Sequence, residues 1–220
     1  MTSLKTVLKQ IRRELKDKER VKDQIQKDMR RITSLSKQAI LSIHQKRLKE
    51  ARKLLEKTRE IISKLNEMAK LHPDMVYSGL YSVALQEFAE ASIFFTLIEE
   101  GRFLTPKEIN VPSMDYVLGL ADVIGEYRRL ALDALREGNV KKSEECLRVM
   151  DEIYTELMAM DEAYMLVPGL RRKCDIARKI IETTRGDVTH EARRQSLEKH
   201  MKRLERLEKR FEALEKGEAK

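Results

Sequence analysis

The chain has 220 residues, 37% of them charged and 41% hydrophobic, and a formal net charge of +8. Its 8 glycines and 4 prolines are too few for a many-turned β protein, and no run stays apolar over the roughly 20 residues that cross a bilayer. We therefore expect an all-α, cytoplasmic protein that forms one domain over residues 1–220 and has no membrane partner.

The first half of the chain predicts long helices. Over residues 4–71 apolar residues recur at helical spacing, which indicates one or two amphipathic helices with a weak break near Gln45. A stop is expected at Pro73, because proline disfavours helix in the residue before it. Residues 75–98 are apolar around most of the helix circumference, as in an element buried on several sides. Gly101 can close this central helix in a left-handed conformation.

The second half predicts further helices with shorter connections. Ser113 is a candidate N-cap for a helix over residues 114–137. Another helix is expected over residues 140–164, and a third over residues 170–184 that stops at Gly186. The body of the protein would end there.

The last segment, residues 187–220, predicts a charged helix from about Thr189, which brings the total to about seven helices. Its apolar residues recur at the spacing of a coiled-coil seam: Leu197, Met201, Leu204, Leu207, Phe211 and Leu214. Such a seam needs a partner, which is either the protein's own core or another subunit. An adaptor protein that binds partner helices through this seam is one interpretation.

Charge is unevenly distributed along the chain. The net charge is +12 over residues 1–73, −10 over residues 74–170 and +6 over residues 171–220. RNA would be attracted to the basic flanks and repelled by the acidic middle, unless bound cations offset the negative charge there. Alternatively, the Lys- and Glu-rich helices merely solvate their outer faces.

Two acids are unusual because of where they lie. Glu87 and Glu90 are the only charged residues between Met75 and Ile98, in a chain where more than a third of residues are charged. Three positions apart on a helix, they share one face. Two neighbouring carboxylates repel each other, and a divalent cation relieves that repulsion.

Acids with few basic neighbours recur on two later predicted helices. Asp122 and Glu126 are four positions apart on one of them, and Asp151 lies on the next, in a stretch without bases. If the three helices converge, these carboxylates could hold cations that activate water for phosphodiester cleavage. The acids could equally cap helices, accept hydrogen bonds or face solvent. A di-iron centre is disfavoured, because no histidine has a glutamate three residues before it.

Three segments resemble the translin/Trax family in order and spacing, over roughly residues 70–187: LQEFAEASIFFTLIEEGRFLT, SMDYVLGLADVIGEYRRLALDALREGN and GLRRKCDIARKIIETTRGD. The resemblance implies a bundle of about seven helices and closed homo-oligomers, commonly octamers. It also implies binding of single-stranded RNA or single-stranded DNA. The charged tail after Gly186 is not covered by the resemblance.

Within these segments, Gln86–Ala91 follows the pattern Q-E-[aromatic]-x-E-A of Trax-like members, which are metal-dependent endoribonucleases. The resemblance thus implies three ligands for Mg²⁺ or Mn²⁺: Glu87, Glu90 and Asp151. Asp122 and Glu126 also fit, as residues that position water or complete the ligand shell. Translin-type members lack the acid pair and mainly bind nucleic acid, so a non-catalytic protein that binds RNA or single-stranded DNA is the alternative.

Overall fold

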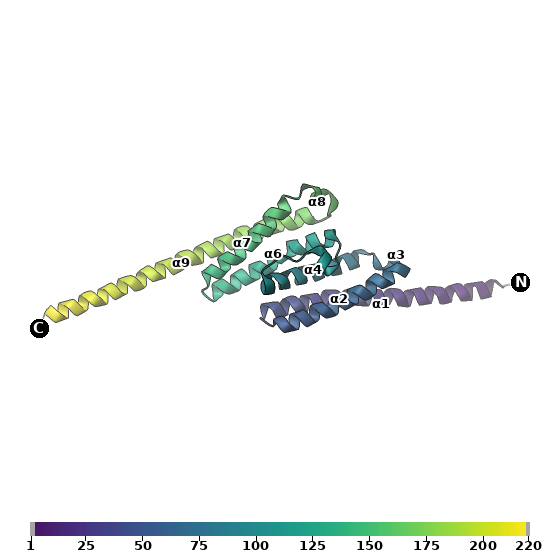
Figure 1. Ribbon diagram of the computed structural model, residues 1–220, viewed down its shortest axis with the longest axis horizontal. Coiled ribbons are helices and arrows are strands. Elements are labelled where there is room, and N and C mark those ends of the chain that lie inside the picture. Colours follow the sequence, from purple (N-terminus) through teal and green to yellow (C-terminus); the bar gives the residue numbers. More distant parts are fainter. Residues whose placement is uncertain (1–2, 219–220) are drawn as a thin grey trace. The chain divides into compact units, whose positions relative to one another are not determined.

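The computed structural model describes residues 3–218, apart from the side chains of residues 162, 163, 213–216 and 218. All regular structure in this part of the chain is α-helical (Figure 1). Six helices are long: α1 Leu4–His44, α2 Leu48–Leu71, α4 Gly79–Glu100, α6 Ser113–Arg136, α7 Val140–Met158 and α9 Leu170–Glu218. Three are short: α3 Pro73–Val76, α5 Pro106–Ile109 and α8 Asp161–Leu166. The all-α prediction is confirmed. Nine helices are described where about seven were expected, because three short helices were not predicted and the last two expected helices are continuous in α9.

Most helix ends follow the signals in the sequence. The weak break near Gln45 separates α1 from α2, and Lys46 turns there with φ 60°. Gly101 closes α4 in the left-handed conformation with φ 68°, and its N–H donates to the Leu97 carbonyl 3.2 Å away. The central helix begins at Gly79 rather than at residue 75, because Pro73 starts the separate short helix α3.

The predicted stop at Gly186 is wrong, since α9 continues through it to Glu218. A glycine inside a helix costs only about 1 kcal/mol relative to alanine. Side-chain contacts hold α9 immediately before this glycine. Arg128 of α6 donates to Thr184 Oγ1 at 2.7 Å, and Arg185 binds Asp151 of α7. These contacts offset the weakness at Gly186, so the helix is not interrupted.

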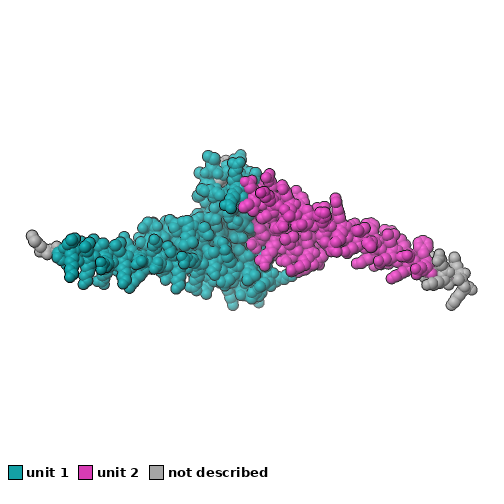
Figure 2. Space-filling model, turned by 180° about the vertical axis from the view of Figure 1, so that it is seen from behind, with its two compact units in different colours: residues 1–123, 157–174 teal, residues 124–156, 175–220 magenta. Residues whose placement is uncertain are grey.

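The helices gather into two compact units, which Figure 2 colours separately. Unit 1 comprises residues 1–123 and 157–174, and unit 2 comprises residues 124–156 and 175–220. In unit 1, α1 packs against α2 and α4. Its core includes several fully buried apolar side chains: Ile25, Met29, Ile32, Leu65, Phe88, Ile93 and Phe94. In unit 2, apolar residues of α6, α7 and α9 are buried: Tyr127, Ala131, Met150, Ile153 and Ile181. That residues 1–220 form one domain stays a prediction.

Both terminal helices carry exposed apolar residues. The first turns of α1 expose five of them: Leu4, Val7, Leu8, Ile11 and Leu15. The seam predicted near the end of α9 is exposed too: Leu197, Met201, Leu204, Leu207 and Phe211. Leu214, its sixth member, lies outside the described side chains. Among the helices described, none combines the length and the apolar character that crossing a membrane requires.

Candidate functional site

The central helix α4 carries two acids on an otherwise uncharged, largely buried stretch. Glu87 and Glu90 lie one helical turn apart, so their side chains leave the same side of α4. Glu90 is 9% exposed, and the Glu87 side chain is 21% exposed. α4 therefore places two carboxylates together at a position that is partly shielded from water.

A lysine from another helix lies beside the first of these acids. Lys37 of α1 places Nζ 3.2 Å from Glu87 Oε1, and the lysine side chain is 64% exposed. The ammonium group shows that this carboxylate accommodates a neighbouring cation. Mg²⁺ and Mn²⁺ prefer oxygen ligands such as carboxylates. Glu87 and Glu90, one turn apart on the same side of α4, therefore fit part of a metal site. An ion bound there would replace Lys37 or share Glu87 with it.

A glycine on α6 lets that helix pack directly against the acid-bearing turn of α4. A Cβ atom added to Gly119 would be too close to three atoms of α4: Gln86 O at 2.7 Å, Ala89 Cβ at 2.8 Å and Glu90 N at 2.9 Å. Real Cβ atoms essentially never approach other heavy atoms this closely. The absence of a side chain at Gly119 therefore sets how near α6 comes to the backbone of the acidic turn.

A buried acid one turn earlier on α6 connects the same two helices. Asp115 is 8% exposed and accepts a hydrogen bond from the Ser82 hydroxyl. It also accepts one from Gln86 Nε2 at 3.4 Å. Sequence reasoning missed Asp115, because an acid in the first turn of a helix is common for electrostatic reasons alone. Lys37 was missed as well, since nothing distinguishes it among the many bases of the N-terminal segment.

Asp122, the predicted acid of α6 in unit 1, is paired with a base. Lys173 of α9 places Nζ against Asp122 Oδ2 and also donates to the Leu118 carbonyl oxygen at 3.3 Å. The carboxylate is thus neutralised by a lysine that is itself fixed to the backbone of α6. A role for Asp122 in holding water or metal would use its second oxygen, Oδ1, or require Lys173 to move.

Asp151 and Glu126 belong to unit 2, whereas Glu87, Glu90 and Asp122 belong to unit 1. Both Asp151 oxygens accept from Arg185 Nη2 of α9, at 2.8 and 2.9 Å. Among the described residues, no three His, Cys, Asp or Glu side chains are grouped so that they could hold a metal ion. The structure therefore brings Glu87 and Glu90 together on one turn, and the complete ligand set stays a prediction.

These features define a class of all-α protein with a buried, acid-bearing central helix and basic flanks. Residues 20–216 match the Translin family. The chain belongs to this family.

Known relatives agree with this assignment. Protein MJ0175 of Methanocaldococcus jannaschii is 36% identical over 193 residues, which are 87% of this chain and 85% of the relative. The structure of AfC3PO in complex with duplex RNA has a TM-score of 0.73 and 33% identity, and the match covers 84% of this chain and 96% of AfC3PO. Apo-NeC3PO has a TM-score of 0.73 and 26% identity, covering 87% of this chain and 98% of NeC3PO. The predicted translin-like helical fold is confirmed.

Proposed function

We propose that this protein is a Mg²⁺- or Mn²⁺-dependent endoribonuclease of the Trax-like branch, which cleaves single-stranded RNA as a homo-oligomer. The observation that carries the proposal is the pair Glu87 and Glu90 on α4, within the hexapeptide that resembles Trax-like members. Membership of the translin family and the complex of AfC3PO with duplex RNA support an RNA substrate. The net charge of +12 over residues 1–73 supplies bases for phosphate contacts.

Each assigned acid has a role in this proposal. Glu87 and Glu90 hold the cation from α4, and Asp151 supplies a third carboxylate from α7. A bound Mg²⁺ or Mn²⁺ would lower the pKa of water and offset charge at the scissile phosphate. Asp122 or Glu126 orients the attacking water or completes the ligand shell.

One observation favours a second candidate, a translin-type protein that binds RNA or single-stranded DNA without cutting it. Glu87 is paired with Lys37, and Asp151 with Arg185. These bases neutralise the acids without any metal, as expected if the acids are structural.

The deciding experiment is a cleavage assay on single-stranded and duplex RNA with Mg²⁺, with Mn²⁺ and with chelator. Glu87→Gln and Glu90→Gln should abolish metal-dependent cleavage of single-stranded RNA, while RNA affinity measured with chelator is kept. Glu99→Gln is the matched control, because Glu99 also lies on α4 and pairs with a base of another helix, Arg52, at 2.5 Å. It should cleave as the wild type does. If the wild type binds RNA but leaves it intact in every metal, the second candidate is correct.

Two further measurements test the rest of the proposal. RNA affinity should fall steeply as salt rises, because phosphate contacts release counterions. No detectable RNA binding at low salt would instead support an adaptor protein. The mass of the assembly by light scattering should be a multiple of the subunit mass, with eight subunits expected from the family resemblance. A monomer in solution would contradict the homo-oligomer.

A further inference from the structure

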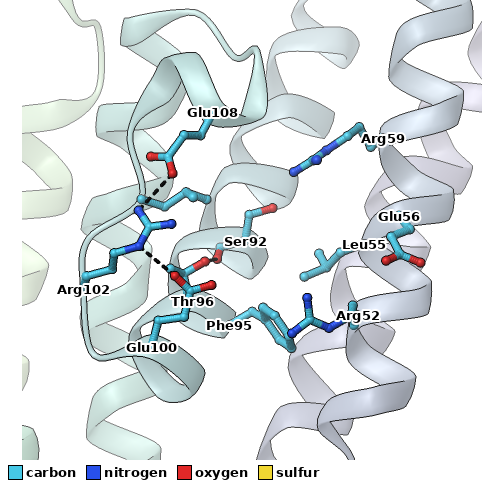
Figure 3. Close-up of a pocket in the computed structure, with 11 residues that line it drawn as sticks. Arg52, Leu55, Glu56, Arg59, Ser92, Phe95, Thr96, Glu100, Arg102 and Glu108 are labelled. Atoms are coloured by element: carbon cyan, nitrogen blue, oxygen red, sulfur yellow. Dashed lines mark hydrogen bonds and ion pairs between the residues drawn. The ribbon is translucent and has the colours of Figure 1, made fainter.

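Unit 1 contains a second feature of interest, a cavity of about 350 Å³ between α2, the second half of α4 and the segment that follows α4 (Figure 3). Its volume lies within the range of about 300–1,000 Å³ that is usual for small-molecule sites. None of the five acids assigned to catalysis lines it. The cavity therefore needs an explanation of its own.

Two hydrogen-bond donors in this cavity lack partners. Arg59 of α2 has no hydrogen bond or ion pair within the part of the chain that the structure describes. Ser92 of α4 is 4% exposed, and its buried Oγ also has no partner among the described residues. Figure 3 shows both side chains directed into the space between α2 and α4. A buried hydroxyl without a partner is costly, so a ligand atom that accepts from Ser92 would be stabilising.

A third donor is held in place by two acids. Arg102 binds Glu100 through Nε at 2.7 Å and Glu108 through Nη1 at 2.9 Å. The pKa of Glu108 lies below its ordinary value, first because the Thr105 backbone N–H donates to it, then through the Thr105 hydroxyl and Arg102. Arg102 is thus fixed by ionised partners. Among the described residues no contact uses its Nη2 group, and Figure 3 shows the guanidinium facing the cavity.

The cavity is also lined by apolar side chains and by two further charged residues, Arg52 and Glu56. Leu55, Phe95 and Leu104 line the cavity, and Arg52 lies over the Phe95 ring at 5.3 Å from its centroid. Arg52 is neutralised by Glu99. The acid Glu56 also lines the cavity, but Figure 3 shows its carboxylate directed away from Ser92.

We propose that this cavity binds a nucleoside 5′-monophosphate. The phosphate accepts hydrogen bonds from Arg59, Ser92 Oγ and Arg102 Nη2, since guanidinium groups match phosphate oxygens in geometry and charge. The nucleoside lies against the apolar wall. One unpaired guanidinium suits a single phosphate group, whereas the carboxylates of Glu56, Glu100 and Glu108 would repel the additional charge of a diphosphate or triphosphate.

Calorimetry on the full-length protein in the presence of chelator tests this proposal. Adenosine 5′-monophosphate should bind saturably, and adenosine and inorganic phosphate each more weakly. Arg59→Gln should weaken nucleotide binding roughly tenfold or more, because a charge-assisted contact is lost. Ser92→Ala should weaken it by a smaller factor. Lys57→Ala is the matched control, since it removes one charge from α2 outside the cavity and should bind as the wild type does.

Several results would overturn the assignment. These are no saturable binding of the nucleotide, equal affinity of the wild type and Arg59→Gln, adenosine bound as tightly as the nucleotide, or inorganic phosphate bound as tightly as the nucleotide. Circular dichroism verifies that each variant is folded, and Ser92→Ala retains the test if Arg59→Gln does not fold. Because binding is measured directly and without divalent metal, the outcome is independent of RNA cleavage.

Discussion

The contact at Gly119 leads to a sharp prediction, because alanine at two glycines of α6 should change stability in opposite directions. At Gly119 a methyl group would lie 2.7–2.9 Å from three atoms of α4. Two of these are backbone atoms, which cannot move without shifting the helix. Such overpacking lowers the free energy of unfolding by about 1–3 kcal/mol. The better helix propensity of alanine raises it by about 0.5–1 kcal/mol. Gly119→Ala should therefore destabilise unit 1 by up to about 2.5 kcal/mol.

Gly125→Ala is the matched control on the same helix. Apart from its chain neighbours and the adjacent backbone of α6, no heavy atom among the described residues lies within 4 Å of a Cβ built at Gly125. The substitution should thus stabilise the protein by about 0.5–1 kcal/mol, through helix propensity alone. Urea unfolding followed by circular dichroism measures both changes. If Gly119→Ala proves as stable as Gly125→Ala, α6 does not approach α4 as described.

The same variant connects stability to the proposed chemistry. A shift of α4 at residues 86–90 would displace Glu87 and Glu90, which the proposal makes metal ligands. At a temperature where Gly119→Ala stays folded, its metal-dependent RNA cleavage should still be lower than that of the wild type. Unchanged cleavage alongside the loss of stability would separate the packing of α4 from the proposed site.

Three further predictions concern individual side chains. Lys37→Ala removes an ion pair whose lysine is mostly exposed, so the free energy of unfolding should change by less than about 0.5 kcal/mol. The Mn²⁺ concentration for half-maximal cleavage should fall, because the lysine no longer competes for Glu87. A rise would contradict the proposed site. Asp151→Asn removes a partly exposed ion pair with Arg185, so the free energy of unfolding in urea should fall by less than about 1 kcal/mol. RNA cleavage should nevertheless be abolished. Retained cleavage would show that Asp151 is not part of the site. Burial raises the pKa of Tyr81 to about 12 from 10.0, and Tyr77 and Asp115 add to the increase. Because this pKa is raised on folding, the stability that the neutral phenol contributes is complete below pH 10.0 and is lost as the pH rises through about 12. Tyr81→Phe should therefore reduce the loss of stability between neutral and alkaline pH in urea unfolding, and an unchanged pH dependence would refute the assignment.

Helices were predictable here because their signals are local. Apolar spacing located the helices of the first 71 residues, and Gly101 ended α4 as expected, since a left-handed residue suits glycine at a helix end. Gly186 misled the prediction because its local signal is the same as that of a terminating glycine. What keeps α9 continuous there is tertiary, namely the contacts of Thr184 with Arg128 and of Arg185 with Asp151.

The candidate site was predictable only in part, for a related reason. Glu87 and Glu90 could be found because a charged pair contrasts with the apolar helix around it. Their surroundings depend on residues far away in the chain. Lys173 is 51 residues from Asp122, and Arg185 is 34 residues from Asp151. Neither spacing has a pattern that a sequence could show, so the bases that neutralise the acids emerged only from the fold.

Those bases also link metal binding to RNA binding in the proposed enzyme. Three of the five assigned acids are paired with a base from α1 or α9: Glu87 with Lys37, Asp122 with Lys173 and Asp151 with Arg185. A cation taken up by the carboxylates would release lysine and arginine side chains, which could then contact phosphates. Coupling between two ligands is reciprocal, so RNA should raise the affinity for metal by the same factor by which metal raises the affinity for RNA. With the wild-type protein and an RNA whose phosphodiester bonds resist hydrolysis, binding titrations with Mn²⁺ should show this mutual gain, and Lys37→Ala should diminish it. Equal RNA affinity with Mn²⁺ and with chelator would show that metal uptake does not release these bases for RNA binding.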